Sequence, residues 1–161
     1  MIKKGSTLFL KAVLVVMALI ALAIAIFALP SIYKGGSAEF PMASKALLAI
    51  ITILYVAAVP FFITLWQTWK LLNYIDTNKA FSDMSVRVLR NIKRCATIIS
   101  ILGMATVPLL LPIADADDAP GLLVIGFAFA CAPIVVAVFA AVLEKLLTNA
   151  IEMKSENELT V

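Results

Sequence analysis

Four long stretches of this chain contain no Asp, Glu, Lys or Arg. They are Ala12–Leu29, Ala46–Trp69, Cys95–Ile113 and Leu122–Leu143. A helix rises 1.5 Å per residue, so about 20 apolar residues cross a hydrocarbon core about 30 Å thick. Hydrophobic residues make up 63% of the chain and charged residues 14%, whereas soluble domains are nearer about half and about a quarter. The sequence therefore predicts an all-α, four-helix transmembrane bundle that forms a single integral membrane domain over residues 1–161.

Basic residues are distributed unevenly over the loops between these stretches. We take the first stretch as a retained span, because it is longer than the roughly 7–15-residue apolar region of a signal peptide. With four spans, both termini and the loop 70–94 share one side, which carries eleven Lys or Arg residues against two, Lys34 and Lys45, on the other. The positive-inside rule then predicts a multi-pass protein of the cell membrane with both termini in the cytoplasm.

The spacing of lysines and prolines suggests an internal repeat. Lys11 precedes Pro30 by the same interval that separates Lys93 from Pro112, and "KLLNYID" after the second stretch resembles "KLLTNAIE" after the fourth. Two tandem helical hairpins are one interpretation, because transporters use parallel repeats of this kind. Chance spacing of common residues is the other.

The apolar stretches contain no side chain that usually carries chemistry in a membrane. Ion-coupled transporters place ionisable residues within their spans, and here no Asp, Glu, Lys or Arg occurs in them, while His is absent from the whole chain. Nucleophile–base pairs are also missing from the polar segments. We therefore expect no enzymatic activity and no cofactor.

The longest polar segment, 73–94, predicts a cytoplasmic amphipathic helix that leads directly into the third span. Ser82 is a good N-cap residue, and Asp83 lies in the electropositive first turn. Apolar residues then recur at helical spacing, and three arginines fall on one face; these arginines are Arg87, Arg90 and Arg94. At the membrane boundary they can contact anionic lipid or an acidic protein. Direct nucleic-acid binding is not expected, because the membrane surface has the same charge as DNA.

The fourth stretch also continues past the membrane as an apolar stripe. Its residues recur at the spacing of one helix face: Leu143, Leu146, Leu147, Ala150 and Ile151. The helical extensions either pack against one another or leave a groove in which a partner helix docks. We predict a docking platform made of the three arginines with Leu143, Leu146, Leu147 and Ile151.

Three aspartates are concentrated in "ADADDAPG", residues 114–121. Carboxylate oxygens are ligands for Ca²⁺ or Mg²⁺, so Asp115, Asp117 and Asp118 are candidate metal ligands. The segment lacks the glycine and distal glutamate of an EF-hand loop. A solvated turn that ends one helix and begins the next is the favoured interpretation.

Four strings along the chain resemble a known family: "GSTLFLK", "LLNYIDTNKAFSDMSVRVLRNIKRC", "DDAPG" and "IEMKSENELTV". This is a Firmicutes-type family of small four-span integral membrane proteins of unknown function. Its members are often encoded beside a Cro-like helix-turn-helix regulator. The resemblance implies a membrane sensor or anti-regulator that docks such a transcriptional regulator in the cytoplasm. A small transporter or pore and a structural, lipid-interacting protein are the alternatives.

Overall fold

The computed structural model describes residues 4–160 and is helical throughout them, without a strand. Four helical segments within this range are long and apolar enough to cross a membrane. They are Lys4–Glu39, Pro41–Asp76, Asp83–Ala116 and Gly121–Leu159. The predicted all-α, four-span architecture is confirmed. Every helical segment extends beyond its apolar stretch, so polar residues that follow or precede the stretches also adopt helical structure.

The first segment contains α1 (Lys4–Ala23), a π-helical turn (Ile24–Ala28) and α2 (Leu29–Glu39). Pro30 follows the last apolar residue of the predicted span, yet the helix does not end there. A proline ring clashes with the carbonyl four residues before it, which here belongs to Ile26, and a wider π turn accommodates such a disruption. The Tyr55 hydroxyl donates a 2.7 Å hydrogen bond to the Ala25 carbonyl in this turn.

The second segment begins with a short 3₁₀ turn (Pro41–Ala43) and continues as α3 (Ser44–Asp76). The third contains α4 (Asp83–Thr106), a 3₁₀ turn (Pro108–Leu110) and the short α5 (Leu111–Ala116). The fourth is a single helix, α6 (Gly121–Leu159). Pro60 and Pro133 lie inside α3 and α6, and neither helix ends at its proline.

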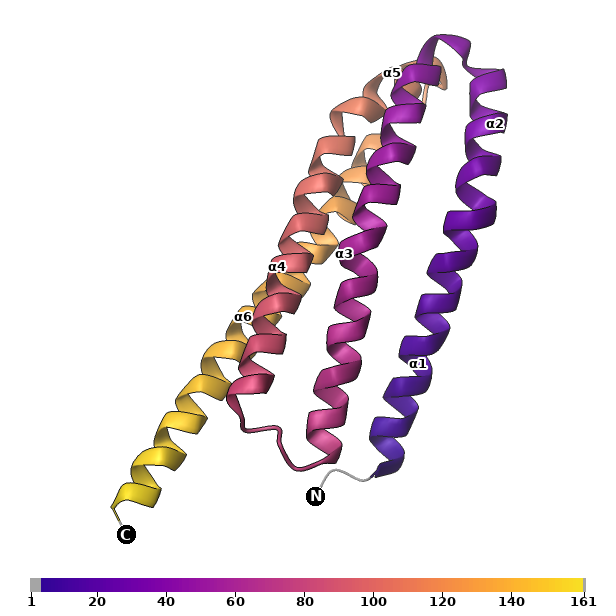
Figure 1. Ribbon diagram of the computed structural model, residues 1–161. Helices are drawn as coiled ribbons and strands as arrows, with labels where there is room; N and C mark the ends of the chain where they lie inside the picture. Colours follow the sequence, from indigo (N-terminus) through magenta and orange to yellow (C-terminus); the bar gives the residue numbers. More distant parts are fainter. Residues whose placement is uncertain (1–3, 161) are drawn as a thin grey trace.

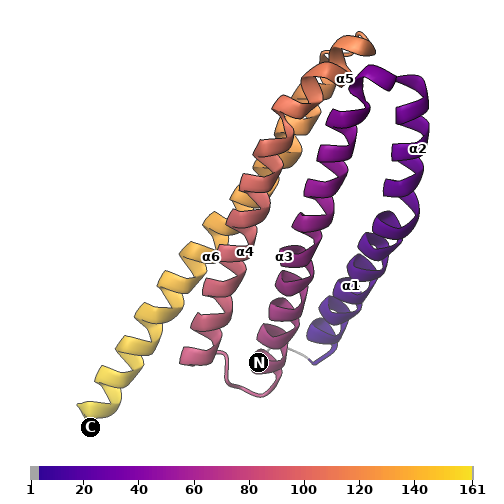
Figure 2. The ribbon, with the colours of Figure 1, turned by 45° about the horizontal axis from the view of Figure 1, so that its top comes forward.

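The four segments form an open row (Figures 1 and 2). Within the described part of the chain, α3 lies between the α1–α2 segment and α4, and α4 lies between α3 and α6. The α1–α2 segment packs sparsely on α3 and makes no substantial contact with α4 or α6. Two helical hairpins are present, but their internal packing differs, because α4 and α6 make the most extensive contact in the molecule.

Small residues allow the close approach of α4 and α6. Ser100 donates a buried 2.7 Å hydrogen bond from its hydroxyl to the Ala130 carbonyl, three residues before Pro133. A methyl group added at Gly103 would lie 3.1 Å from the Cα atom of Ala130. Membrane helices associate through such contacts, since lipid tails offer no hydrophobic driving force between them.

Most apolar side chains of the spans face outward. The buried residues concentrate on α4, whereas Thr7 is the one buried residue in the described α1. Large side chains such as Phe27 in the π-helical turn and Phe129 on α6 are largely exposed. In water such a surface would be unfavourable, but hydrocarbon solvates it. The burial pattern therefore agrees with a membrane environment.

We predict that Gly103→Leu destabilises the protein by about 1–3 kcal/mol, because the new side chain must separate two packed backbones. The measurement is thermal unfolding of the purified protein in mild detergent. Gly5→Leu is the matched control, since no atom lies within 4 Å of a methyl group added at Gly5. Equal unfolding temperatures for the two variants would contradict the close α4–α6 contact.

Candidate functional site

The corner between α3 and α4 is held by backbone and side-chain hydrogen bonds. Asn78 has a positive φ of 57°, and the Lys79 amide donates to the Tyr74 carbonyl at 2.8 Å, which is a common way to end a helix. Ser82 then caps α4 by accepting a hydrogen bond from the Ser85 amide. The predicted N-cap, and the amphipathic helix that runs directly into the third span, are confirmed.

Beside this corner, α4 packs against both α3 and α6. Val88 and Ile92 of α4 form a buried cluster with Ala140 of α6, and Leu71 and Tyr74 of α3 pack against it. At this end of the molecule α4 therefore packs against its two neighbours, as in the first of the two arrangements that the sequence left open.

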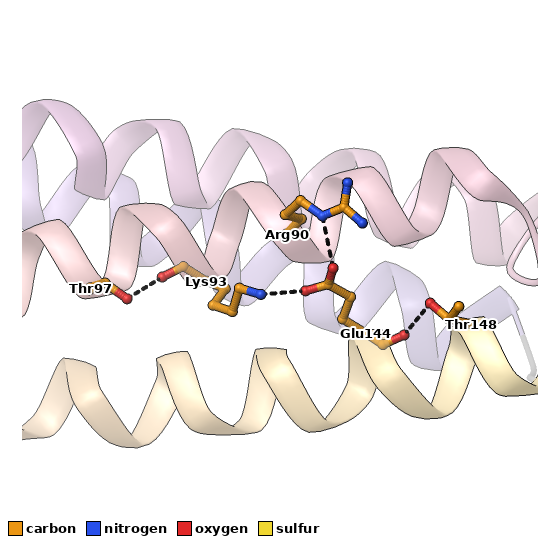
Figure 3. Close-up of polar contacts among 5 residues, drawn as sticks. All are labelled: Arg90, Lys93, Thr97, Glu144 and Thr148. Carbon is orange, nitrogen blue, oxygen red and sulfur yellow. Dashed lines mark hydrogen bonds and ion pairs between the residues drawn. The ribbon is translucent and has the colours of Figure 1, made fainter.

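A bridge of three charged side chains joins α4 to α6 (Figure 3). Arg90 donates from Nε to one carboxylate oxygen of Glu144 at 2.8 Å, and Lys93 donates from Nζ to the other at 2.8 Å. Glu144 is 13% exposed and lies just past the apolar stretch 122–143. The hydrogen bond from Lys93, supported by Arg90, lowers the pKa of this carboxyl below its ordinary value, against the opposing effect of burial.

The three predicted docking arginines differ in whether they form an ion pair within the chain. Arg90 is bound to Glu144 of its own chain. Arg87 and Arg94 are exposed and form no ion pair with any described residue. Two of the three predicted side chains are therefore available to another molecule.

The apolar stripe of α6 is divided in the same way. Leu147, Ala150 and Ile151 are partly buried. Leu143 and Leu146 are 51% and 59% exposed. From Glu152 to Leu159 every residue is exposed, and Figures 1 and 2 show this end of α6 running beyond the α3–α4 corner, away from the other helices.

A second ion pair joins the N-terminal half of α1 to the end of α3. Lys11 Nζ lies 2.6 Å from a carboxylate oxygen of Asp76, at the end of α3 and beyond its apolar stretch. This lysine lowers the pKa of the Asp76 carboxyl. Sequence reasoning missed both this pair and Glu144. A signal was available for Glu144, which directly follows the fourth charge-free stretch, while Lys93 lies two residues before the third. Asp76 lies seven residues past the second stretch, and nothing in the sequence marked it as the partner of Lys11.

The three aspartates are exposed at the opposite end of the molecule, Asp115 at the end of α5 and Asp117 and Asp118 in the turn that follows it. Asp118 has a positive φ of 49°, and the next amide, of Ala119, donates to the Ala114 carbonyl at 2.9 Å. This arrangement ends α5 as a Schellman-type cap does. Within residues 4–160 no group of three or more His, Cys, Asp or Glu side chains is gathered so that it could hold a metal ion.

Comparison with known proteins places these features in a family. Residues 31–161 match the family described as "Protein of unknown function (DUF2975)". The chain belongs to this family. It is also 49% identical over 156 residues to the "Uncharacterized membrane protein YoaS" of Bacillus subtilis (strain 168), covering 97% of this chain and 98% of that protein. No solved structure matches the chain. The resemblance to a bacterial family of uncharacterised membrane proteins is confirmed, whereas the neighbouring regulator stays a prediction.

We predict that Glu144→Gln lowers the free energy of unfolding at neutral pH by about 1 kcal/mol, a small value because Arg90 and Lys93 are partly solvated. Since the folded-state pKa of Glu144 is lowered, its contribution is present while the carboxylate is ionised and is lost in acid. The difference from the unsubstituted protein should therefore close as the pH falls through the carboxyl range. Glu152→Gln, at an exposed position of α6, is the control. A difference in unfolding free energy between Glu144→Gln and the unsubstituted protein that stays constant with pH would contradict the ionic bridge.

Proposed function

We propose that this membrane protein docks a cytoplasmic protein partner on the exposed ends of α4 and α6, as a membrane sensor or anti-regulator would. The observation that carries the proposal is the length of α6. Its 39 residues make a helix about 58 Å long at 1.5 Å per residue, roughly twice the hydrocarbon thickness. The part that follows residue 143 therefore extends well past the membrane.

Exposed apolar side chains gather on one side of this extension. Leu143, Leu146 and Met153 fall within less than a quarter turn of the helix at 3.6 residues per turn, and each is at least half exposed. Lipid reaches Leu143 but not Met153, more than two turns further on. An amphipathic helix end of this kind is a surface on which a partner helix packs.

The distribution of basic residues supports a cytoplasmic location for this end of α4 and α6. The eleven basic residues assigned to that side include Arg87 and Arg94, which the structure leaves exposed and unpaired among the described residues. We define the docking surface as Arg87 and Arg94 of α4 with Leu143, Leu146 and Met153 of α6. It offers a partner an exposed apolar strip on α6 and two unpaired positive charges on the neighbouring α4, and complementary acidic groups would accelerate and orient association.

The resemblance noted from the sequence suggests the kind of partner. A helix-turn-helix transcriptional regulator is a small helical protein, and holding it at the membrane would keep it from its operator. The docking surface suits such a partner because α6 presents a single accessible helix.

Topology fusions test the orientation on which this proposal rests. Reporters fused at Gly36 and Asp117 are expected outside the cell, and reporters fused at Asn78 and Val161 in the cytoplasm, because of the basic-residue bias. Alkaline phosphatase and a fluorescent protein serve as the complementary reporters. An external Val161 would place the docking surface on the wrong side.

Docking itself is tested by charge substitutions on α6. We expect Leu146→Asp to reduce at least tenfold the recovery of a co-expressed helix-turn-helix regulator in a pull-down from mild detergent, because an unpaired charge is then buried at the interface. Arg87→Glu should weaken recovery to a smaller extent, as rim charges do. Ser155→Asp, exposed on the opposite side of α6, is the control and should bind normally. Equal recovery with all three variants would refute the docking surface.

A further inference from the structure

A hollow of about 360 Å³ lies between α1 and α3, where the two helices pack sparsely. Its lining is apolar and includes Leu14, Val15 and Ala18 of α1 with Phe62, Trp66 and Trp69 of α3. These residues belong to the first two apolar stretches. We call this hollow the α1–α3 groove. Its volume is at the lower end of the range of roughly 300–1,000 Å³ for small-molecule sites.

One end of the groove carries two lysines placed over its tryptophans. Lys11 Nζ lies 5.6 Å from the centre of the Trp69 ring, and Lys70 Nζ lies 5.8 Å from that of Trp66. Lys11 is neutralised by Asp76. Lys70 has no acidic partner among the described residues, so it leaves one uncompensated positive charge at the mouth of an apolar slot.

From these observations we infer that the α1–α3 groove binds one acyl chain of an anionic phospholipid, whose headgroup pairs with Lys70. The groove opens within the apolar stretches, where lipid chains are the surrounding solvent. Tryptophan at the boundary between headgroups and chains marks the depth at which both parts of a lipid can be held. The cationic mouth selects a negative headgroup. This site is independent of the proposed docking surface.

The only tryptophans of the chain are Trp66 and Trp69, so its fluorescence reports on this groove. Bromine atoms on acyl chains quench tryptophan at contact. Because Trp66 is 61% exposed and meets bulk lipid, the experiment uses Trp66→Phe, which leaves Trp69 as the reporter. The protein is placed in phosphatidylcholine vesicles, and small fractions of brominated phosphatidylglycerol or brominated phosphatidylcholine are added.

We expect phosphatidylglycerol to quench Trp69 with about a fivefold preference over phosphatidylcholine, the factor that one lysine near the surface contributes. Lys70→Gln should remove the preference, whereas Lys145→Gln, with the same loss of charge on α6, should retain it. Ala18→Phe should fill the groove and reduce quenching by both lipids. Ala23→Phe, at an exposed position of α1, should leave quenching unchanged.

Three outcomes would overturn the inference. Equal quenching by the two lipids in the Trp66→Phe protein means that bulk lipid alone reaches Trp69. Unchanged quenching in Ala18→Phe means that the chains approach by another route. Weak quenching by both lipids, together with a dimer in light scattering that Ala18→Phe converts to a monomer, means that a second copy of the chain fills the groove.

Discussion

A helix that crosses hydrocarbon must satisfy its backbone hydrogen bonds within itself, because no water is there to replace them. The chain shows how this requirement is met at two of its interruptions. The π turn before Pro30 receives a hydrogen bond from Tyr55, and a 3₁₀ turn continues the third segment at Pro108. Helical structure thus continues through every proline of the spans. The same helices extend beyond both faces of the membrane, where they carry polar residues.

The helices are fastened to one another unequally. Between α4 and α6, Gly103 and Ser100 allow backbone contact with Ala130, and the Glu144 bridge joins the two helices nearer the α3–α4 corner. Between α1 and α3, larger side chains leave a hollow, with one ion pair at its base. The α4–α6 pair is therefore closely packed, whereas the α1–α3 pair is loosely packed. Close packing suits a rigid docking surface on α6, and loose packing suits a lipid-accessible groove beside α1.

The two proposals use different parts of this arrangement. The docking surface depends on the rigid pair, since α4 and α6 must hold Arg87 and Leu146 in a fixed relation. The lipid site depends on the loose pair, where a chain can enter from the side. A lipid that fills the groove would stabilise the α1–α3 contact by mass action.

Sequence alone determined the number of spans, the helix start at Ser82 and the continuation of α4 into the third span, because hydropathy, capping and periodicity are properties of neighbouring residues. It did not determine which arginine of one face is bound, nor which leucines of the stripe are exposed. Arg90 meets Glu144, and Leu146 faces outward, because α4 and α6 adopt one rotation about their axes. That rotation is set by contacts such as Gly103 with Ala130 between residues distant in the chain, so only the tertiary structure decided it.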